Sequence, residues 1–202
     1  MYTEPMKQLF FVHGGDSLKA GEDFFTHWES DALWRVMDPF VKGLPHKKWK
    51  EDLFEKLGVD WVCAAPRFPS DMDAHYVQWK WWFEKHTPFM KDGVVLVGHS
   101  FGGNFLGKYL AENELPIRVG QLHLVAPAWG EGDFIMPVSL ALIERQVSRT
   151  HIYHSSDDVV VPIAHGERFA AALPSAEFVR FLDRNHFFAQ VEFPELLERL
   201  QR

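Results

Sequence analysis

Apolar residues follow two spacings, which alternate from one end of the chain to the other. Short continuous apolar runs are typical of strands that are covered on both faces. They predict strands over residues 8–13, 59–64, 94–98, 121–126, 151–154 and 177–181. Apolar residues that recur every three or four positions predict helices over residues 48–57, 74–85, 101–111, 164–173 and 193–200. This alternation predicts an α/β fold with a mostly parallel central sheet and helices on both faces.

The last predicted helix has the most regular apolar stripe. Four of its residues follow the i, i+3, i+4, i+7 spacing: Phe193, Leu196, Leu197 and Leu200. We therefore expect this helix to dock on the sheet. A similar stripe on the helix over residues 74–85 leaves Trp81 outside it, so Trp81 is expected to be exposed. At 202 residues, the chain suits a single domain over residues 1–202.

The segment Gly98-His99-Ser100-Phe101-Gly102 directly follows an apolar run and opens a predicted helix. A serine on a sharp turn between a strand and a helix projects its hydroxyl above the sheet edge. The flanking glycines let neighbouring backbone pass without a Cβ clash. The order of strand, turn and helix distinguishes this nucleophile elbow from an ordinary glycine-rich turn. Ser100 is therefore the candidate nucleophile.

A serine hydroxyl needs an imidazole to accept its proton and a carboxylate to orient that imidazole. When the serine lies on an elbow, the acid is expected after a later strand and the histidine nearer the carboxyl end. Asp157 and Asp158 follow the fifth predicted strand, and His186 follows the sixth. His186 is therefore the candidate general base and acid.

Two adjacent aspartates leave a choice of acid. Because neighbouring side chains in extended backbone point in opposite directions, only one aspartate is expected to face the histidine. We favour Asp158 and expect Asp157 to accept backbone hydrogen bonds in the turn. Asp183, close to His186 in the sequence, is a third candidate whose ordinary role is that of a solvated turn residue.

A site for acyl transfer also needs N–H donors for the negative oxygen of a tetrahedral intermediate. The amide of Phe101, directly after the nucleophile, is one predicted donor. The second is expected in the glycine-rich turn after the first strand, His13-Gly14-Gly15-Asp16. Gly15 is the preferred second donor, with Gly14 or Asp16 as alternatives.

Two connections, residues 14–43 and 127–137, are long and rich in aromatic side chains. They either cover the candidate site or pack as partial helices over the core. Residues 21–45, largely within the first connection, could replace a lid. In the second connection, Trp129 and Phe134 are the candidate substrate-pocket residues.

Composition excludes several other classes of protein. The net charge of -7 disfavours binding to a nucleic-acid backbone, because such binding depends on clustered lysine and arginine. No basic segment joins a long apolar one, so we expect no secretory signal and no membrane association, and a cytoplasmic location. The one cysteine, Cys63, is expected in the core and cannot form an intramolecular disulfide. The 11 histidines show no metal-ligand spacing, so no metal is expected.

Taken together, these motifs resemble the α/β-hydrolase superfamily. The resemblance spans nearly the whole chain: His13-Gly14-Gly15, Gly98-x-Ser100-x-Gly102, Asp158 with Pro162 four positions later, and His186. The short length and the run of residues 155–158 are similar to the small serine hydrolases related to retinoblastoma-binding protein nine, which lack a large cap domain. The resemblance implies Ser100 as nucleophile, Asp158 as acid and His186 as base. It also implies an oxyanion hole from Phe101 and the turn after the first strand. Arg184-Asn185 departs from the pattern, since relatives often have glycines before the histidine.

The sequence thus predicts a serine hydrolase that cleaves a small ester, thioester or amide through an acyl-enzyme on Ser100. No cofactor is expected, and the expected partner is a small-molecule acyl substrate. Two alternatives come from other classes. One is a binding or interaction protein that keeps the scaffold without turnover. The other is an acyltransferase or a lyase with the same nucleophile. No pattern in the sequence predicts an oligomeric state.

Overall fold

The computed structural model describes residues 6–18, 21, 23, 48–130 and 132–202. At its centre is a six-stranded sheet in which every neighbouring pair of strands is parallel. The strands are β1 (Lys7–Val12), β2 (Trp61–Ala64), β3 (Val94–His99), β4 (Val119–Val125), β5 (Val147–Ser155) and β6 (Glu177–Phe181). Their order across the sheet is β2-β1-β3-β4-β5-β6, so β1 and β3 are neighbours although β2 lies between them in the sequence.

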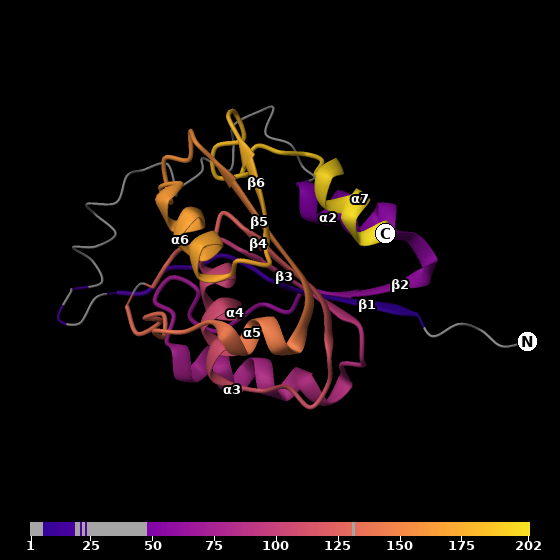
Figure 1. Ribbon diagram of the computed structural model, residues 1–202, viewed down its shortest axis with the longest axis horizontal. Helices are drawn as coiled ribbons and strands as arrows, with labels where there is room; N and C mark the ends of the chain where they lie inside the picture. The colour runs from indigo at the N-terminus through magenta and orange to yellow at the C-terminus, as the bar shows by residue number, and fades with distance from the viewer. Residues whose placement is uncertain (1–5, 19–20, 22, 24–47, 131) are drawn as a thin grey trace, which may run out of the picture.

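Helices cover both faces of the sheet (Figure 1). On one face, α2 (Trp49–Leu57) and α7 (Pro194–Gln201) lie together. The other face is covered by α3 (Tyr76–His86), α4 (Phe101–Glu112), α5 (Ala141–Gln146) and α6 (Ala164–Ala172). This three-layer arrangement confirms the predicted fold class. None of the helices in the described part of the chain is both long and apolar enough to cross a bilayer.

The central strand β3 shows why short continuous apolar runs predict this sheet. Its side chains alternate between two cores: Leu96 belongs to the core under α4, and Val95 and Val97 belong to the core under α7. All three are buried. A strand that is covered on both faces has no polar position until it reaches the sheet edge.

Three of the differences from the predicted elements have a clear local cause. Val59 does not belong to a strand, because Gly58, at a φ of 70°, ends α2 and opens a short 3-10 turn before β2. β5 begins four residues before the predicted start, because Val147 already pairs with Val119 of β4. The helix α5 is not predicted, since its six residues are too few to show a helical period.

An aromatic cluster fixes the first turn of α4 against α3. Trp79 is fully buried and makes edge-on contacts with Phe101, Phe105 and Phe134, with ring centroids 5.6 to 5.7 Å apart. Its indole N–H donates to the carbonyl oxygen of Pro69 at 2.8 Å. Because Phe101 follows Ser100 directly, this packing also holds the turn that carries the candidate nucleophile.

The last helix docks as predicted. Leu196 and Leu200 of α7 are buried in the core that α7 shares with α2, and the two helices lie side by side in Figure 1. On the other face of the sheet, the predicted stripe of α3 is also confirmed, since Trp79 and Phe83 are fully buried while Trp81 is 55% exposed.

We predict that Leu196→Ala lowers the free energy of unfolding by about 2–5 kcal/mol, because it leaves a cavity under α7. Urea denaturation measures this change. The control is Glu198→Ala on the exposed side of the same helix, where Glu198 pairs with the exposed Arg202. The control should change the unfolding free energy by less than about 1 kcal/mol. Equal values for wild type and Leu196→Ala would contradict the docking.

Candidate active site

Ser100 lies on a sharp turn between β3 and α4. Its φ of 55° is in the left-handed region, which costs a residue with a Cβ about 1–3 kcal/mol. Hydrogen bonds hold this conformation from two sides. The Ser100 N–H donates to the Val125 carbonyl at 2.8 Å, and the Ser100 carbonyl accepts from the Gly103 N–H at 2.9 Å. The local geometry is therefore that of a nucleophile elbow.

The elbow packs directly against the end of β1. A Cβ at Gly102 would collide with the carbonyl oxygens of Val12 and His13, so only glycine fits where α4 begins. A Cβ at Gly14 would lie 3.6 Å from Oγ of Ser100. The strand order changes direction between β1 and β3. In open α/β sheets, the carboxyl ends of strands at such a point form the usual ligand-binding crevice.

His186 and Asp158 meet in the interior. Nδ1 of His186 lies 2.8 Å from Oδ2 of Asp158, and the two side chains are 1% and 0% exposed. The other carboxylate oxygen accepts the backbone N–H groups of Val160 and Val161, each at 2.9 Å. Because an ionised carboxylate only accepts, Nδ1 of His186 is the donor. Nε2 is then the nitrogen of the neutral ring that can accept a proton.

Asp158 remains ionised although it is buried. Burial alone would raise the pKa of this carboxyl, but hydrogen bonds from His154 and His186 hold the pKa well below its ordinary value. The negative charge is therefore present beside the imidazole at neutral pH. It accepts the hydrogen bond that fixes the orientation of the ring.

Asp157 contacts the backbone of the loop that carries His186 and does not contact the ring. Its Oδ1 accepts the Asn185 N–H at 2.8 Å and the Ser155 hydroxyl at 2.5 Å. The oxygen of the same hydroxyl accepts the Arg184 N–H at 3.0 Å. Two consecutive N–H groups just before His186 are thus bound to the last residue of β5 and to the turn after it.

The residues on both sides of His186 have left-handed backbone. The φ angles of Asn185 and Phe187 are 45° and 60°. Asparagine tolerates this region better than most residues with a Cβ, so it can stand where relatives often have glycine. Oδ1 of Asn185 also accepts the His186 N–H at 2.7 Å. Asp183, the third candidate acid, has a side chain that is 88% exposed.

His99, inside the elbow, contacts the loop of His186. Its Nε2 donates to the His186 carbonyl at 3.0 Å, and the two ring centroids are 5.0 Å apart. Burial, together with the nearby His186, lowers the pKa of His99 to about 3, so its ring is neutral at physiological pH. The imidazole therefore joins the elbow to the loop of the candidate base.

Ser100 and His186 therefore lie at the same sheet edge and are linked through His99. Within the described residues, no hydrogen bond connects the Ser100 hydroxyl to the His186 ring. Such a bond is often long without substrate and shortens in the substrate complex.

The turn after β1 has a fixed peptide orientation. Nε2 of His13 accepts the Phe68 N–H at 2.7 Å, so the ring proton is on Nδ1, which donates to the Gly14 carbonyl at 2.6 Å. The peptide group is planar and trans, so this bond also directs the Gly15 N–H away from His13.

The available amides at this edge are fewer than the sequence suggests. The N–H of Asp16 donates to the Asp71 carbonyl at 2.9 Å, which occupies it. Neither Gly15 nor Phe101 has an acceptor for its N–H among the described residues. Phe101 is the first residue of α4, where the helix offers no internal acceptor. The two N–H groups that the sequence predicts as oxyanion donors thus have no acceptor in the part of the chain that the structure describes.

Ser100 lines a cavity of about 300 Å³. Its walls come from the ends of β1 and β3, the first turn of α2 and the residues after His186. Four aromatic side chains line it: Phe11, Trp49, Phe187 and Phe188. Lys50 and Glu51, also in the wall, form an ion pair at 3.1 Å. A cavity of this size suits a small ligand.

Neither Trp129 nor Phe134 lines this cavity. Phe134 is fully buried, with its ring centroid 4.4 Å from that of Phe101, so it belongs to the core. Trp129 packs on Phe169 of α6 with ring centroids 4.8 Å apart. Most of residues 14–43 and of the lid candidate 21–45 lie outside the described residues.

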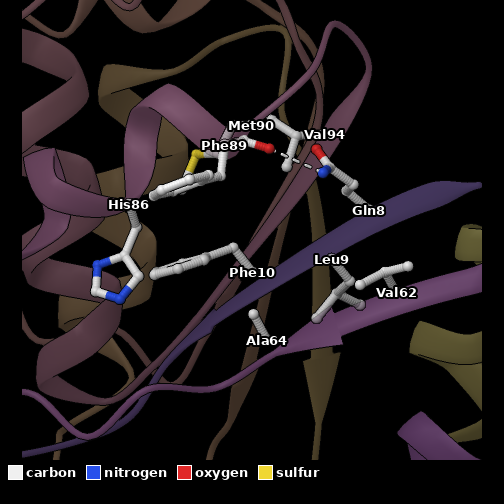
Figure 2. Close-up of a pocket in the computed structure, with 9 residues that line it drawn as sticks. All are labelled: Gln8, Leu9, Phe10, Val62, Ala64, His86, Phe89, Met90 and Val94. Atoms are coloured by element: carbon white, nitrogen blue, oxygen red, sulfur yellow. Dashed lines mark hydrogen bonds between the residues drawn. The ribbon is translucent and has the colours of Figure 1, made fainter.

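A second cavity, of about 170 Å³, lies at the amino ends of β1 and β3, away from Ser100 (Figure 2). Its lining is mainly apolar, and its polar side chains are occupied. The amide of Gln8 donates to the Phe89 carbonyl at 3.0 Å and accepts the Lys91 N–H at 2.8 Å. Nδ1 of His86 lies 2.8 Å from the Trp82 carbonyl. None of the described residues that line this cavity is a serine or a cysteine.

Cys63 is half-buried, contrary to the predicted core position, because β2 is the edge strand of the sheet. Burial raises the pKa of its thiol to about 11, which disfavours the reactive thiolate. In the part of the chain that the structure describes, no group of three or more histidine, cysteine or acidic side chains could hold a metal ion.

Solved structures with a similar backbone are hydrolases and esterases. The ydeN gene product of B. subtilis has a TM-score of 0.75 at 16% identity, over 97% of each chain. The esterase RhEst1 from Rhodococcus sp. ECU1013 has a TM-score of 0.62 at 15% identity, over 97% of this chain and 89% of its own. MGS-MChE2 is an α/β-hydrolase enzyme from the metagenome of Mar Chica lagoon sediments. It has a TM-score of 0.57 at 18% identity, over 97% of this chain and 89% of its own.

The chain therefore has the α/β-hydrolase fold. No protein-family model matches its sequence, and a comparison with curated proteins found no similar sequence. The narrower likeness to hydrolases related to retinoblastoma-binding protein nine stays a prediction.

We predict that His99 makes the stability of the protein fall in acid. Below pH 6.5 an unfolded histidine binds a proton that folded His99, with its pKa near 3, does not bind. The contribution of neutral His99 to the free energy of unfolding is therefore complete above pH 6.5, and it is lost as the pH falls toward 3. His99→Gln keeps an N–H donor for the His186 carbonyl but cannot titrate. Between about pH 6 and pH 4, the unfolding free energy should fall more steeply for wild type than for the variant. The difference in slope should be about 1.4 kcal/mol per pH unit. Urea denaturation at several pH values tests this, and parallel curves would contradict it.

Proposed function

We propose that this protein is a serine hydrolase in which Ser100 is the nucleophile, His186 the general base and acid, and Asp158 the orienting carboxylate. One observation carries the proposal. The buried Asp158–His186 hydrogen bond leaves Nε2 of His186 as the proton acceptor, at the edge where the strained elbow presents Ser100. The α/β-hydrolase fold supports it, because this fold presents such a set of residues from the carboxyl ends of its strands.

In the proposed reaction, Oγ of Ser100 attacks the acyl carbon of the substrate while its proton passes to Nε2 of His186. The carbonyl oxygen becomes negative and accepts hydrogen bonds from the N–H groups of Phe101 and Gly15. Collapse of this intermediate breaks the bond to the leaving group, which takes the proton from His186. A water molecule then attacks the acyl-enzyme, gives a proton to His186, and releases the carboxylic acid from Ser100 as the proton returns to Oγ.

Asp158 acts in this cycle without taking the proton itself. Its pKa is held well below the ordinary value, so the proton that leaves Ser100 stays on the imidazole. The carboxylate stabilises the positive ring that forms in each half of the reaction.

We propose a small carboxylic ester as the preferred substrate, with a thioester or an amide as the other members of the class. The cavity of about 300 Å³ supports a small substrate. Its aromatic walls support an apolar group on one side of the scissile bond. The esterase among the similar structures is consistent with an ester.

A fluorophosphonate probe should label the folded wild type, and mass spectrometry should locate the adduct on Ser100. Ser100→Ala should remain folded and unlabelled, because it lacks the nucleophile. The exposed Ser156 provides the control, and Ser156→Ala should be labelled as fast as wild type. Folded wild type that stays unlabelled would contradict the proposal and favour a binding protein. Transfer of the acyl group to an added alcohol in preference to water would favour an acyltransferase.

The two neighbouring aspartates allow a matched comparison. Asp158→Asn should lower kcat for p-nitrophenyl acetate by about 10³- to 10⁴-fold, because the amide removes the charge that orients and stabilises the imidazole. Asp157→Asn keeps an Oδ1 acceptor for the Asn185 N–H and should lower kcat by less than about 10-fold. The assignment of Asp158 is wrong if the two variants lose activity equally.

A further inference from the structure

A second buried histidine contacts the carboxylate of Asp158. His154, near the end of β5, is fully buried, and its Nε2 lies 3.5 Å from Oδ2 of Asp158. The same oxygen accepts Nδ1–H of His186 at 2.8 Å. Two imidazoles, one from the end of β5 and one from the loop after β6, therefore approach one carboxylate oxygen.

The hydrogen bonds of His154 define which of its nitrogens carries the proton. Nε2 lies 2.8 Å from the carbonyl oxygen of Val161, and a carbonyl can only accept, so Nε2 is protonated. Its N–H points at the Val161 carbonyl and has Oδ2 of Asp158 as a second, longer acceptor. Nδ1 is buried and has no partner in the described part of the chain.

His154 also closes a loop of contacts around the turn over residues 158–161. The Val161 N–H donates to Oδ1 of Asp158 at 2.9 Å, while the Val161 carbonyl accepts from His154 at 2.8 Å. Both polar groups of Val161 are thus occupied, one by the acid and one by the strand that precedes it. The turn cannot move outward without breaking one of these bonds.

The helix α6 leaves space for this ring. A Cβ at Gly166 would lie 2.5 Å from Nδ1 of His154, closer than a Cβ can approach, so glycine is required for the ring to occupy this place. The ionisable groups that act on the ring are Asp158 on the following turn and His165 on α6, and His186 reaches the same carboxylate from the loop after β6.

We propose that His154 is a positioning residue for the acid of the hydrolase reaction. Its Nε2–H ties the 158–161 turn to β5 and gives Oδ2 of Asp158 a second donor. This inference rests on the proposed function and extends it to a residue that touches no substrate. With two donors, Oδ2 is less basic and has one preferred orientation toward His186. The proton from Ser100 then stays on the His186 ring.

His154→Leu removes the donor and keeps an apolar side chain between β5 and α6. We expect the rate of Ser100 labelling by the fluorophosphonate to fall about 10-fold or more, since a small displacement of the triad is costly. The acid limb of the pH–rate profile should move to higher pH, because Oδ2, with one donor fewer, holds the protonated imidazole more strongly. A purely structural role would lower the unfolding midpoint and leave the pH profile in place.

The matched control is His154→Gln, whose amide nitrogen can take the place of Nε2 and donate to the Val161 carbonyl. It should recover most of the labelling rate and the wild-type pH profile. The inference is overturned if folded His154→Leu labels at the wild-type rate with an unshifted profile. It is equally overturned if the labelling rate of the glutamine variant falls as much as that of the leucine variant.

If His154→Leu does not fold, nitrogen NMR of the histidine rings in the unmodified protein provides the test. At neutral pH, Nε2 of His154 should carry a proton, which binds the Val161 carbonyl. A ring whose Nε2 lacks a proton would overturn the inference. Failure of the hydrolase proposal is seen separately, as wild type that stays unlabelled. Labelled wild type with a bare Nε2 on His154 overturns only this inference.

Discussion

The site depends on one buried negative charge, the carboxylate of Asp158. A buried carboxylate is strongly unfavourable unless its oxygens are saturated with donors. Here the Val160 and Val161 N–H groups bind one oxygen, while His154 and His186 approach the other. These donors come from the turn itself, from β5 and from the loop after β6. Keeping the acid ionised therefore requires three segments of the chain to adopt one mutual arrangement.

The parallel sheet provides the common edge on which these segments meet. The carboxyl ends of β1, β3, β5 and β6 open to the same side, so the elbow, the glycine turn, Asp158 and His186 lie at one edge although they are far apart in the sequence. Burial on both faces holds the strands, and the Trp79 cluster holds the start of α4. The strained φ of Ser100 persists because this surrounding structure leaves it no relaxed alternative.

The architecture could be predicted because its signals are local. Continuous apolar runs and helical stripes depend on a few neighbouring residues, and the positions of Ser100, Asp158 and His186 follow from which strand each comes after. The supporting contacts could not be predicted, because they join distant residues. His99 binds the carbonyl of a residue 87 positions later, and Asp157 binds a backbone N–H 28 positions later. Nothing next to either residue in the sequence indicates these partners.

The residues that line the cavity could not be predicted from the sequence either. Aromatic side chains indicate buried area but do not distinguish a core from a ligand site. Phe134 packs in the core, whereas Trp49 and Phe187, which the sequence does not single out, line the cavity beside Ser100. The difference depends on which helix covers which end of the sheet, and that is a property of the assembled fold.

The most direct measurement is a crystal structure of the protein after reaction with a fluorophosphonate. We expect phosphorus bonded to Oγ of Ser100, with one phosphonyl oxygen about 3 Å from the N–H groups of Phe101 and Gly15. Nε2 of His186 should lie within hydrogen-bond distance of the adduct, with Nδ1 still bound to Asp158. An adduct on another residue, or a His186 ring directed away from Ser100, would contradict the account.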